Sequence, residues 1–159
     1  MAMEGLSLEQ RIARLESMEQ IRALKAVYCD LCDRGYGPDG LSALFTEDAV
    51  WDGGPFGRHE GRQAIHDFFK SVSHSLVFAA HLVTNPIIAF QDDDTAHGKW
   101  RLWEPATVNE DGKLVSKILL AAYEDVYVKV DGRWLVKSLT LHVNFFAPLS
   151  DGWADIAVQ

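Results

Sequence analysis

The sequence predicts a single α+β domain in which helices pack on one face of a curved sheet. Apolar residues recur at helical spacing through the N-terminal third, and β-branched and aromatic runs separated by acidic turns follow residue 76. No repeat, linker or low-complexity tract interrupts the chain. Its 159 residues suffice for one core but are few for two, so we expect one domain spanning residues 1–159.

The first expected element is a long amphipathic helix over residues 8–32. Its apolar residues recur every three or four positions: Leu8, Ile12, Leu15, Met18, Ile21, Leu24, Tyr28 and Leu31. Ser7, with Gln10 three residues later, predicts a capping box at its start. The glycine- and proline-containing segment 35–40 must end it.

Shorter elements are expected over the next segment. We predict a short helix over residues 41–45, an extended piece over 49–52, a turn over 52–55 and a helix over 62–73. Four strands then follow, over residues 81–90, 96–108, 113–130 and 133–146, with an Asp131-Gly132 hairpin turn between the last two.

Composition and charge exclude several classes of protein. Hydrophobic residues make up 48% and charged residues 24%, which is typical of a globular domain. The net charge of −8 argues against nucleic acid or an anionic membrane as partner. No apolar run reaches the roughly 18 residues of a membrane-spanning helix, and residues 1–16 lack a secretory signal pattern. We therefore expect a cytoplasmic protein.

The two cysteines form a C-x-x-C motif but do not predict redox or metal chemistry. Cys29 and Cys32 fall near the C-terminal end of the expected helix, where the helix dipole disfavours a thiolate. A zinc site needs two further ligands at recognisable spacing, which the sequence does not offer. We expect both cysteines to be buried packing residues, and no metal.

Two of the six histidines are candidates for acid–base chemistry. His59 and His66 are expected to be solvated, whereas His81 opens a strand and His142 lies within one, among apolar neighbours. A buried histidine is often satisfied by a backbone carbonyl, but near a carboxylate it has a pKa suited to a general base.

The acids after Tyr28 are ambiguous from periodicity alone. At about 3.6 residues per turn, Tyr28 lies on the apolar stripe, whereas Asp30 and Asp33 lie off it. Periodicity therefore predicts a solvated Asp33, unless the helix unwinds just before Gly35. A carboxylate at a helix C-terminus has its charged form disfavoured, which makes it a better base.

The strands carry polar and aromatic residues that fit either a cavity or an ordinary fold. Tyr123, Asp125, Tyr127 and Lys129 share one face by alternation. The other residues that could line an apolar pocket, or belong to the core or the solvated face, are Trp51, Phe56, Trp100, Arg101, Trp103, Glu104, Asn144, Phe145 and Phe146.

Four segments resemble the SnoaL-like branch of the nuclear transport factor 2-like superfamily. They are EQIRALKAVYCDLCDRG, LSALFTEDAVWDGGPFGRHEGRQAIHDFF, HLVTNPIIAF and YEDVYVKVDGRWLVKSLTL, which together cover most of the chain. The resemblance implies a cone-shaped α+β fold, with a curved mixed or antiparallel sheet wrapped on the long N-terminal helix and the shorter helices. It identifies fold more securely than substrate.

Within that branch the layout is similar to scytalone dehydratase, bile-acid 7α-dehydratase and hexachlorocyclohexane dehydrochlorinase. The resemblance implies that His81 is the general base and that Asp33 orients it, which moves Asp33 from the solvent into the site. It also implies that Tyr28 assists the departing group.

The sequence departs from the residue patterns of the bile-acid dehydratase and of the dehydrochlorinase. Glu104 stands where the bile-acid dehydratase has an aspartate, and that enzyme's late arginine meets only His142 and Asn144 here. The dehydrochlorinase has a lysine at the position of Tyr28 and an arginine near Lys129. We assign substrate contacts to Trp51, Phe56, Trp103, Glu104, Lys129, His142 and Asn144.

The expected function is elimination, most simply dehydration, or a related proton shift on a compact hydrophobic substrate. No organic cofactor is implied. The resemblance also implies an exposed apolar sheet face, which is common in this fold and leads us to expect a homo-oligomer, either a dimer or a trimer. Two alternatives stay open: a non-catalytic small-molecule-binding domain, and a supporting small subunit of a larger enzyme such as a ring-hydroxylating dioxygenase.

Overall fold

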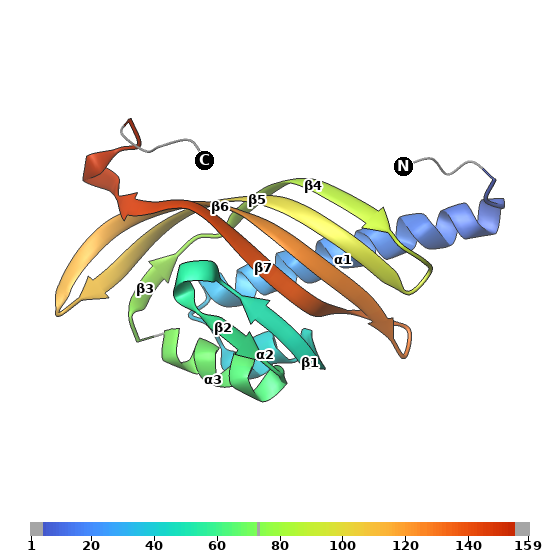
Figure 1. The fold of residues 1–159 in the computed structure, drawn as a ribbon, viewed down its shortest axis with the longest axis horizontal. Helices are drawn as coiled ribbons and strands as arrows, with labels where there is room; N and C mark the ends of the chain where they lie inside the picture. The colour runs from blue at the N-terminus through green and yellow to red at the C-terminus, as the bar shows by residue number, and fades with distance from the viewer. Residues whose placement is uncertain (1–4, 73, 155–159) are drawn as a thin grey trace.

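The computed structural model describes residues 5–72 and 74–154, in which one long helix and shorter ones pack on a seven-stranded sheet (Figure 1). The sheet is a curled, cone-like half-barrel, as expected. Residues 1–4, 73 and 155–159 lie outside the described part. The expected end of the helix over residues 62–73, at Ser73, is therefore among the residues that are not described.

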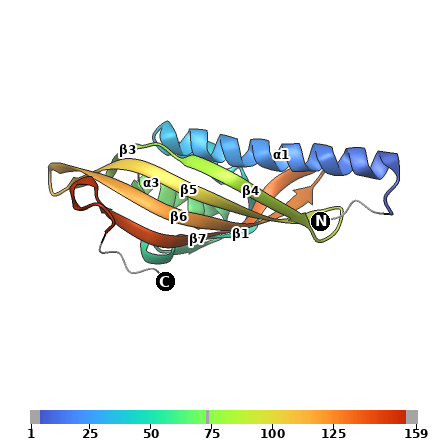
Figure 2. The same ribbon diagram turned by 90° about the horizontal axis from the view of Figure 1, so that it is seen from above.

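Helix α1 (Leu8–Asp33) covers the sheet only with its later turns. Its start has the predicted capping box, in which Gln10 donates its backbone N–H to the Ser7 hydroxyl and accepts the Ser7 N–H. The buried residues begin at Ser17, whereas Leu8 and Ile12 are exposed. Figures 1 and 2 show why, because the first turns of α1 extend past the strand ends.

The segment after α1 forms α2 (Pro38–Ser42), β1 (Phe45–Asp52), the 3₁₀ turn η1 (Gly54–Phe56), β2 (Arg58–Glu60) and α3 (Arg62–Val72). The short helix lies earlier than the expected 41–45. Pro38 occupies its first turn, which proline favours, and Phe45 instead begins β1, paired with Val136.

The remaining strands are β3 (Leu76–Ala79), β4 (Leu82–Phe90), β5 (Thr95–Glu110), β6 (Lys113–Val130) and β7 (Arg133–Pro148), followed by the 3₁₀ turn η2 (Leu149–Asp151). The four long strands confirm the prediction, and the short strands β2 and β3 were not predicted. The order is β2-β1-β7-β6-β5-β3, with β4 also on β5. The β1–β7 pair is parallel and the others antiparallel, so the sheet is mixed.

The core lies between the concave face of this sheet and the later turns of α1 together with α3. Tyr28 of α1 packs edge-on against Phe45 of β1 and Phe69 of α3 at 6.2 Å between ring centroids. Strand alternation buries Tyr123 and Tyr127 of β6 on the same face.

Candidate active site

A cavity of about 380 Å³ opens on the concave face of the sheet. Its lining residues come from α1, α3, the segments beside them and strands β1, β3, β5, β6 and β7: Tyr28, Tyr36, Trp51, Phe56, Phe68, Phe69, Ser71, Val72, Ser75, Leu76, His81, Glu104, Val108, Leu119, Tyr123, Leu141 and Phe146. Most are apolar or aromatic, and none is Lys or Arg. Such a lining suits an uncharged organic ligand with few polar groups.

Asp33 contacts His81, which lines this cavity. Asp33 is the last residue of α1, and its Oδ1 accepts the backbone N–H of His81 at 2.9 Å. The same oxygen lies 2.7 Å from His81 Nδ1. Because a carboxylate only accepts, this contact favours the tautomer with hydrogen on Nδ1 and leaves Nε2 as the basic nitrogen.

Glu104 faces that second nitrogen. The Oε2 atom of Glu104 lies 3.4 Å from His81 Nε2, and the residue is 4% exposed. Burial raises the pKa of Glu104, His81 opposes the rise, and Asp33 adds to it. The raised pKa shifts the carboxyl group towards its protonated form, and in that form it can donate to a basic nitrogen or to a substrate oxygen.

Tyrosine hydroxyls supply the other polar groups. Tyr28 accepts a hydrogen bond from Trp51 Nε1 at 3.2 Å, and its own O–H remains a donor. Burial raises the pKa values of Tyr28, Tyr36 and Tyr123, so all three stay protonated donors. The ring of Tyr36 lies edge-on to His81 at 6.0 Å.

Strand alternation corrects the assignments of Trp103 and His142. Glu104 and Leu141 point into the cavity, so their neighbours Trp103 and His142 lie on the convex face. The His142 side chain is 57% exposed, with Nε2 3.6 Å from Glu124. Neither residue lines the cavity.

Asn144 and Lys129 also lie outside it. Asn144 is exposed at the register shift that separates the Val143–Ala121 and Phe145–Leu120 pairs. Lys129 is on the inner face but farther along β6, where its Nζ lies 3.4 Å from Ser17 Oγ and 5.1 Å from the Trp134 ring centroid.

Several lining residues were not assigned to the site from sequence. Phe68 and Phe69 carried a detectable signal in the apolar stripe of α3, and Leu119 and Tyr123 carried one in the alternation of β6. Tyr36 carried none, because it sits in the breaker segment with a φ of 57°.

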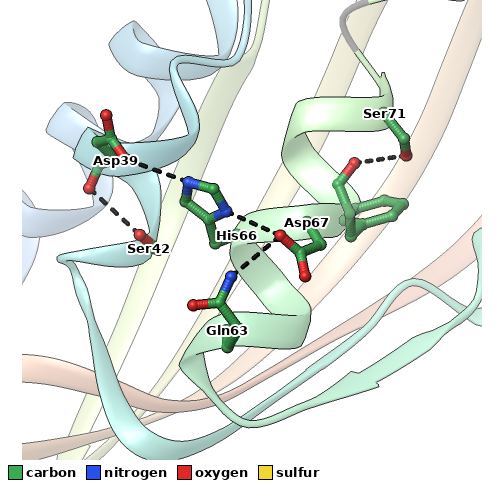
Figure 3. Close-up of polar contacts among 7 residues, drawn as sticks. Asp39, Ser42, Gln63, His66, Asp67 and Ser71 are labelled. Atoms are coloured by element: carbon green, nitrogen blue, oxygen red, sulfur yellow. Dashed lines mark hydrogen bonds and ion pairs between the residues drawn. The ribbon is translucent and has the colours of Figure 1, made fainter.

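The two histidines expected to be solvated are both engaged. His59 stacks on Phe68 at 4.2 Å, and its Nε2 is buried without a partner among the described residues. His66 of α3 lies between two carboxylates, with Nε2 3.1 Å from Asp39 and Nδ1 3.0 Å from Asp67 (Figure 3). Figure 3 also shows that this cluster joins α3 to α2.

Both cysteines are buried free thiols, and burial raises the pKa of Cys29 to about 12. A thiol of that pKa is a poor nucleophile and metal ligand. Within residues 5–72 and 74–154, no group of three His, Cys, Asp or Glu side chains is arranged to hold a metal ion. None of the described helices is long and apolar enough to cross a membrane.

Comparison with known proteins finds a family model and similar solved structures. The model of the SnoaL-like domain matches residues 13–140. A candidate scytalone dehydratase from Novosphingobium aromaticivorans DSM 12444 is 23% identical with a TM-score of 0.79, over 94% of this chain and 93% of that one.

Two further structures have the same architecture. A type 2 hexachlorocyclohexane dehydrochlorinase (LinA) is 23% identical with a TM-score of 0.81, over 94% of this chain and 97% of that one. A candidate aromatic ring hydroxylase from Novosphingobium aromaticivorans is 24% identical with a TM-score of 0.75, over 86% and 96%. At such identities the likeness concerns the fold alone.

Proposed function

Because the chain belongs to the SnoaL-like domain family, we propose that it is a cofactor-independent lyase or isomerase that abstracts a proton from carbon. The observation that carries the proposal is the 2.7 Å contact between Asp33 and His81 Nδ1 at the wall of an apolar cavity. A carboxylate that orients an imidazole and stabilises its protonated form is the standard support for a histidine base.

In the proposed dehydration, His81 Nε2 removes a proton from the carbon next to a carbonyl group. The electron pair of the broken C–H bond forms the new C=C bond, and the bond to the neighbouring hydroxyl breaks. In its protonated form Glu104, whose pKa is raised by burial, delivers a proton to the departing oxygen so that water leaves. The imidazolium then returns its proton to Glu104, whose Oε2 lies 3.4 Å from Nε2.

Tyr28 has the role of a hydrogen-bond donor to the leaving oxygen. Trp51 Nε1 donates to the Tyr28 oxygen, and the Tyr28 hydroxyl, which also interacts with Cys32, supplies its own hydrogen to the leaving oxygen. The aromatic residues Trp51, Phe56 and Phe68 hold the apolar body of the substrate. Since the lining offers no Lys or Arg, we expect a compact, uncharged hydroxy-ketone rather than a phosphate or a free carboxylate.

The first test measures exchange of the carbon-bound proton with deuterium from solvent by NMR, on a panel of alicyclic and aromatic β-hydroxy ketones. The same samples report loss of water, because the conjugated product absorbs in the ultraviolet. His81→Ala is expected to lower the rate about 10²- to 10⁴-fold, and Asp33→Asn also lowers it. The control His142→Ala, on the convex face, is expected to leave the rate unchanged.

Ligand binding separates the two alternatives. If the panel binds in the cavity but neither exchange nor water loss depends on His81, the protein is a non-catalytic binding domain. Copurification of a larger catalytic chain with no activity in the isolated protein would instead support a subunit role.

A further inference from the structure

A buried ammonium group lies beneath the cavity. Lys25 of α1 is 2% exposed, and its Nζ pairs with Asp125 Oδ2 of β6 at 3.0 Å. The same Nζ lies 3.3 Å from the ring centroid of Tyr123 and 5.1 Å from that of Tyr28. Both rings line the cavity, whereas Lys25 does not, so the tyrosines lie between the charge and the ligand space.

Only one carboxylate oxygen of Asp125 pairs with the Lys25 ammonium group. Asp125 Oδ2 also accepts the Tyr127 hydroxyl at 2.6 Å, and that hydroxyl accepts from Trp100 Nε1 at 3.1 Å. Asp125 Oδ1 is buried without a partner among the described residues. The Lys25 ammonium group therefore contacts one carboxylate oxygen of Asp125, and its other close neighbour is the face of the Tyr123 ring.

An ammonium on the face of a phenol ring attracts its π electrons and makes the hydroxyl a stronger hydrogen-bond donor. Tyr123 is 2% exposed and lines the cavity, and its hydroxyl makes no hydrogen bond within the described part of the chain. The residues that line the cavity include no Lys or Arg. A proton abstracted next to a carbonyl leaves negative charge on the carbonyl oxygen, which needs such a donor.

We propose that Tyr123 is the catalytic donor to the substrate's carbonyl oxygen, and that Lys25 is a positioning residue acting through the Tyr123 ring. This assignment rests on the proposed function and adds the substrate class, a ketone or phenol whose oxygen gains negative charge. Tyr28 serves the departing oxygen and Tyr123 the oxygen that remains.

The test compares two probes of the same shape, 2-naphthol and naphthalene, by titration calorimetry. Loss of one hydrogen bond to a charged or partly charged oxygen weakens binding about tenfold or more. Tyr123→Phe should therefore weaken 2-naphthol about tenfold and leave naphthalene unchanged. The control His142→Ala should bind both probes as the unmodified protein does. If Tyr123→Phe binds 2-naphthol with unchanged affinity, the donor assignment is wrong.

A series of naphthols of increasing acidity tests whether Lys25 acts on the Tyr123 hydroxyl through the ring. The unmodified protein should bind the more acidic naphthols more tightly, and Lys25→Met/Asp125→Asn should flatten that trend while the protein still binds naphthalene. An unchanged trend removes Lys25 from the proposal. Tyr123→Phe keeps the ring on the ammonium, so its result decides the donor assignment even if the double variant does not fold.

His81→Ala separates this inference from the proposed function. The donor assignment is supported if the protein binds 2-naphthol more tightly than naphthalene, and if this preference depends on Tyr123 and is retained in His81→Ala. If that preference exists but the protein catalyses no proton exchange, the elimination proposal fails and the oxygen-binding site stands. If His81-dependent exchange occurs and Tyr123→Phe changes neither exchange nor naphthol binding, the donor assignment alone fails.

Discussion

Glu104 is an acidic residue whose charge state depends on its burial. Its pKa is raised above the ordinary value of 4.5, chiefly because burial disfavours the carboxylate. A carboxyl that binds its proton more tightly in the folded than in the unfolded state stabilises the fold below pH 4.5. That stability is lost as the pH rises through the raised pKa.

Glu104→Gln removes this titration and keeps the shape of the side chain. We therefore expect the variant to show a flatter dependence of the free energy of unfolding on pH between pH 4.5 and neutrality, measured by urea titration. Glu16→Gln, exposed on α1, is the matched control and should follow the unmodified protein. A Glu104→Gln curve parallel to the control would contradict the raised pKa.

Tyr28 also has a structural role that can be measured without a substrate. Tyr28→Phe leaves the buried Trp51 Nε1 without its acceptor, and an unsatisfied buried donor costs about 1–3 kcal/mol. Tyr36→Phe is the control, because the Tyr36 hydroxyl makes no hydrogen bond within the described residues. Urea unfolding should show a loss for Tyr28→Phe and little change for Tyr36→Phe. Equal losses would mean that the Trp51 bond is not the cause.

At the scale of elements, the Lys25–Asp125 pair joins α1 to β6. Their side chains are 3% and 1% exposed, so removing one partner leaves an uncompensated buried charge. Lys25→Met should lower the free energy of unfolding by about 3–5 kcal/mol, and Lys25→Met/Asp125→Asn by less. The surface pair Arg34–Asp30 is the control, where Arg34→Met should cost about 0–1 kcal/mol. A double variant less stable than Lys25→Met would refute this account.

The elements that could be predicted from sequence are those with long periodic patterns. Helix α1 and strands β4 to β7 carry enough residues for their spacing to be recognised, and the capping box fixes the start of α1. Strands β2 and β3 have three and four residues, too few to show alternation. They exist because β1 and β5 offer open edges to which they pair.

The site was predictable only in part, for two physical reasons. Periodicity applies inside a helix, and Asp33 is the last residue of α1, so resemblance rather than spacing indicated its inward position. Strand β7 carries apolar residues on both faces, because its convex face is apolar near Phe145. The apolar neighbours of His142 therefore did not reveal which face it occupies.

At the scale of the whole molecule, the two faces of the sheet have different roles. A row of apolar residues crosses the convex face through successive pairs of neighbouring strands: Leu82, Trp103, Leu120 and Phe145. Leu82 is 54% exposed, and Trp153 packs edge-on against Trp103 at 5.9 Å. On the same face, β5 carries Arg101 beside the row, and β6 carries Glu124 farther along. The convex face therefore presents both signs of charge beside an apolar stripe.

We propose that this apolar row binds a second copy of the chain, since a face with an apolar stripe and both signs of charge is complementary to itself in a twofold arrangement. Trp103→Glu places a charge at the centre of the row and should shift the particle towards the monomer mass of 17.8 kDa, measured by light scattering. Lys113→Glu, exposed at the first position of β6, is the control and should not change the mass. A monomeric unmodified protein, or a Trp103→Glu oligomer of unchanged mass, would contradict the proposal. Because Trp103 and Glu104 point to opposite faces of β5, the dissociated variant should still bind naphthalene in the cavity, which shows that it has lost its partner and not its fold.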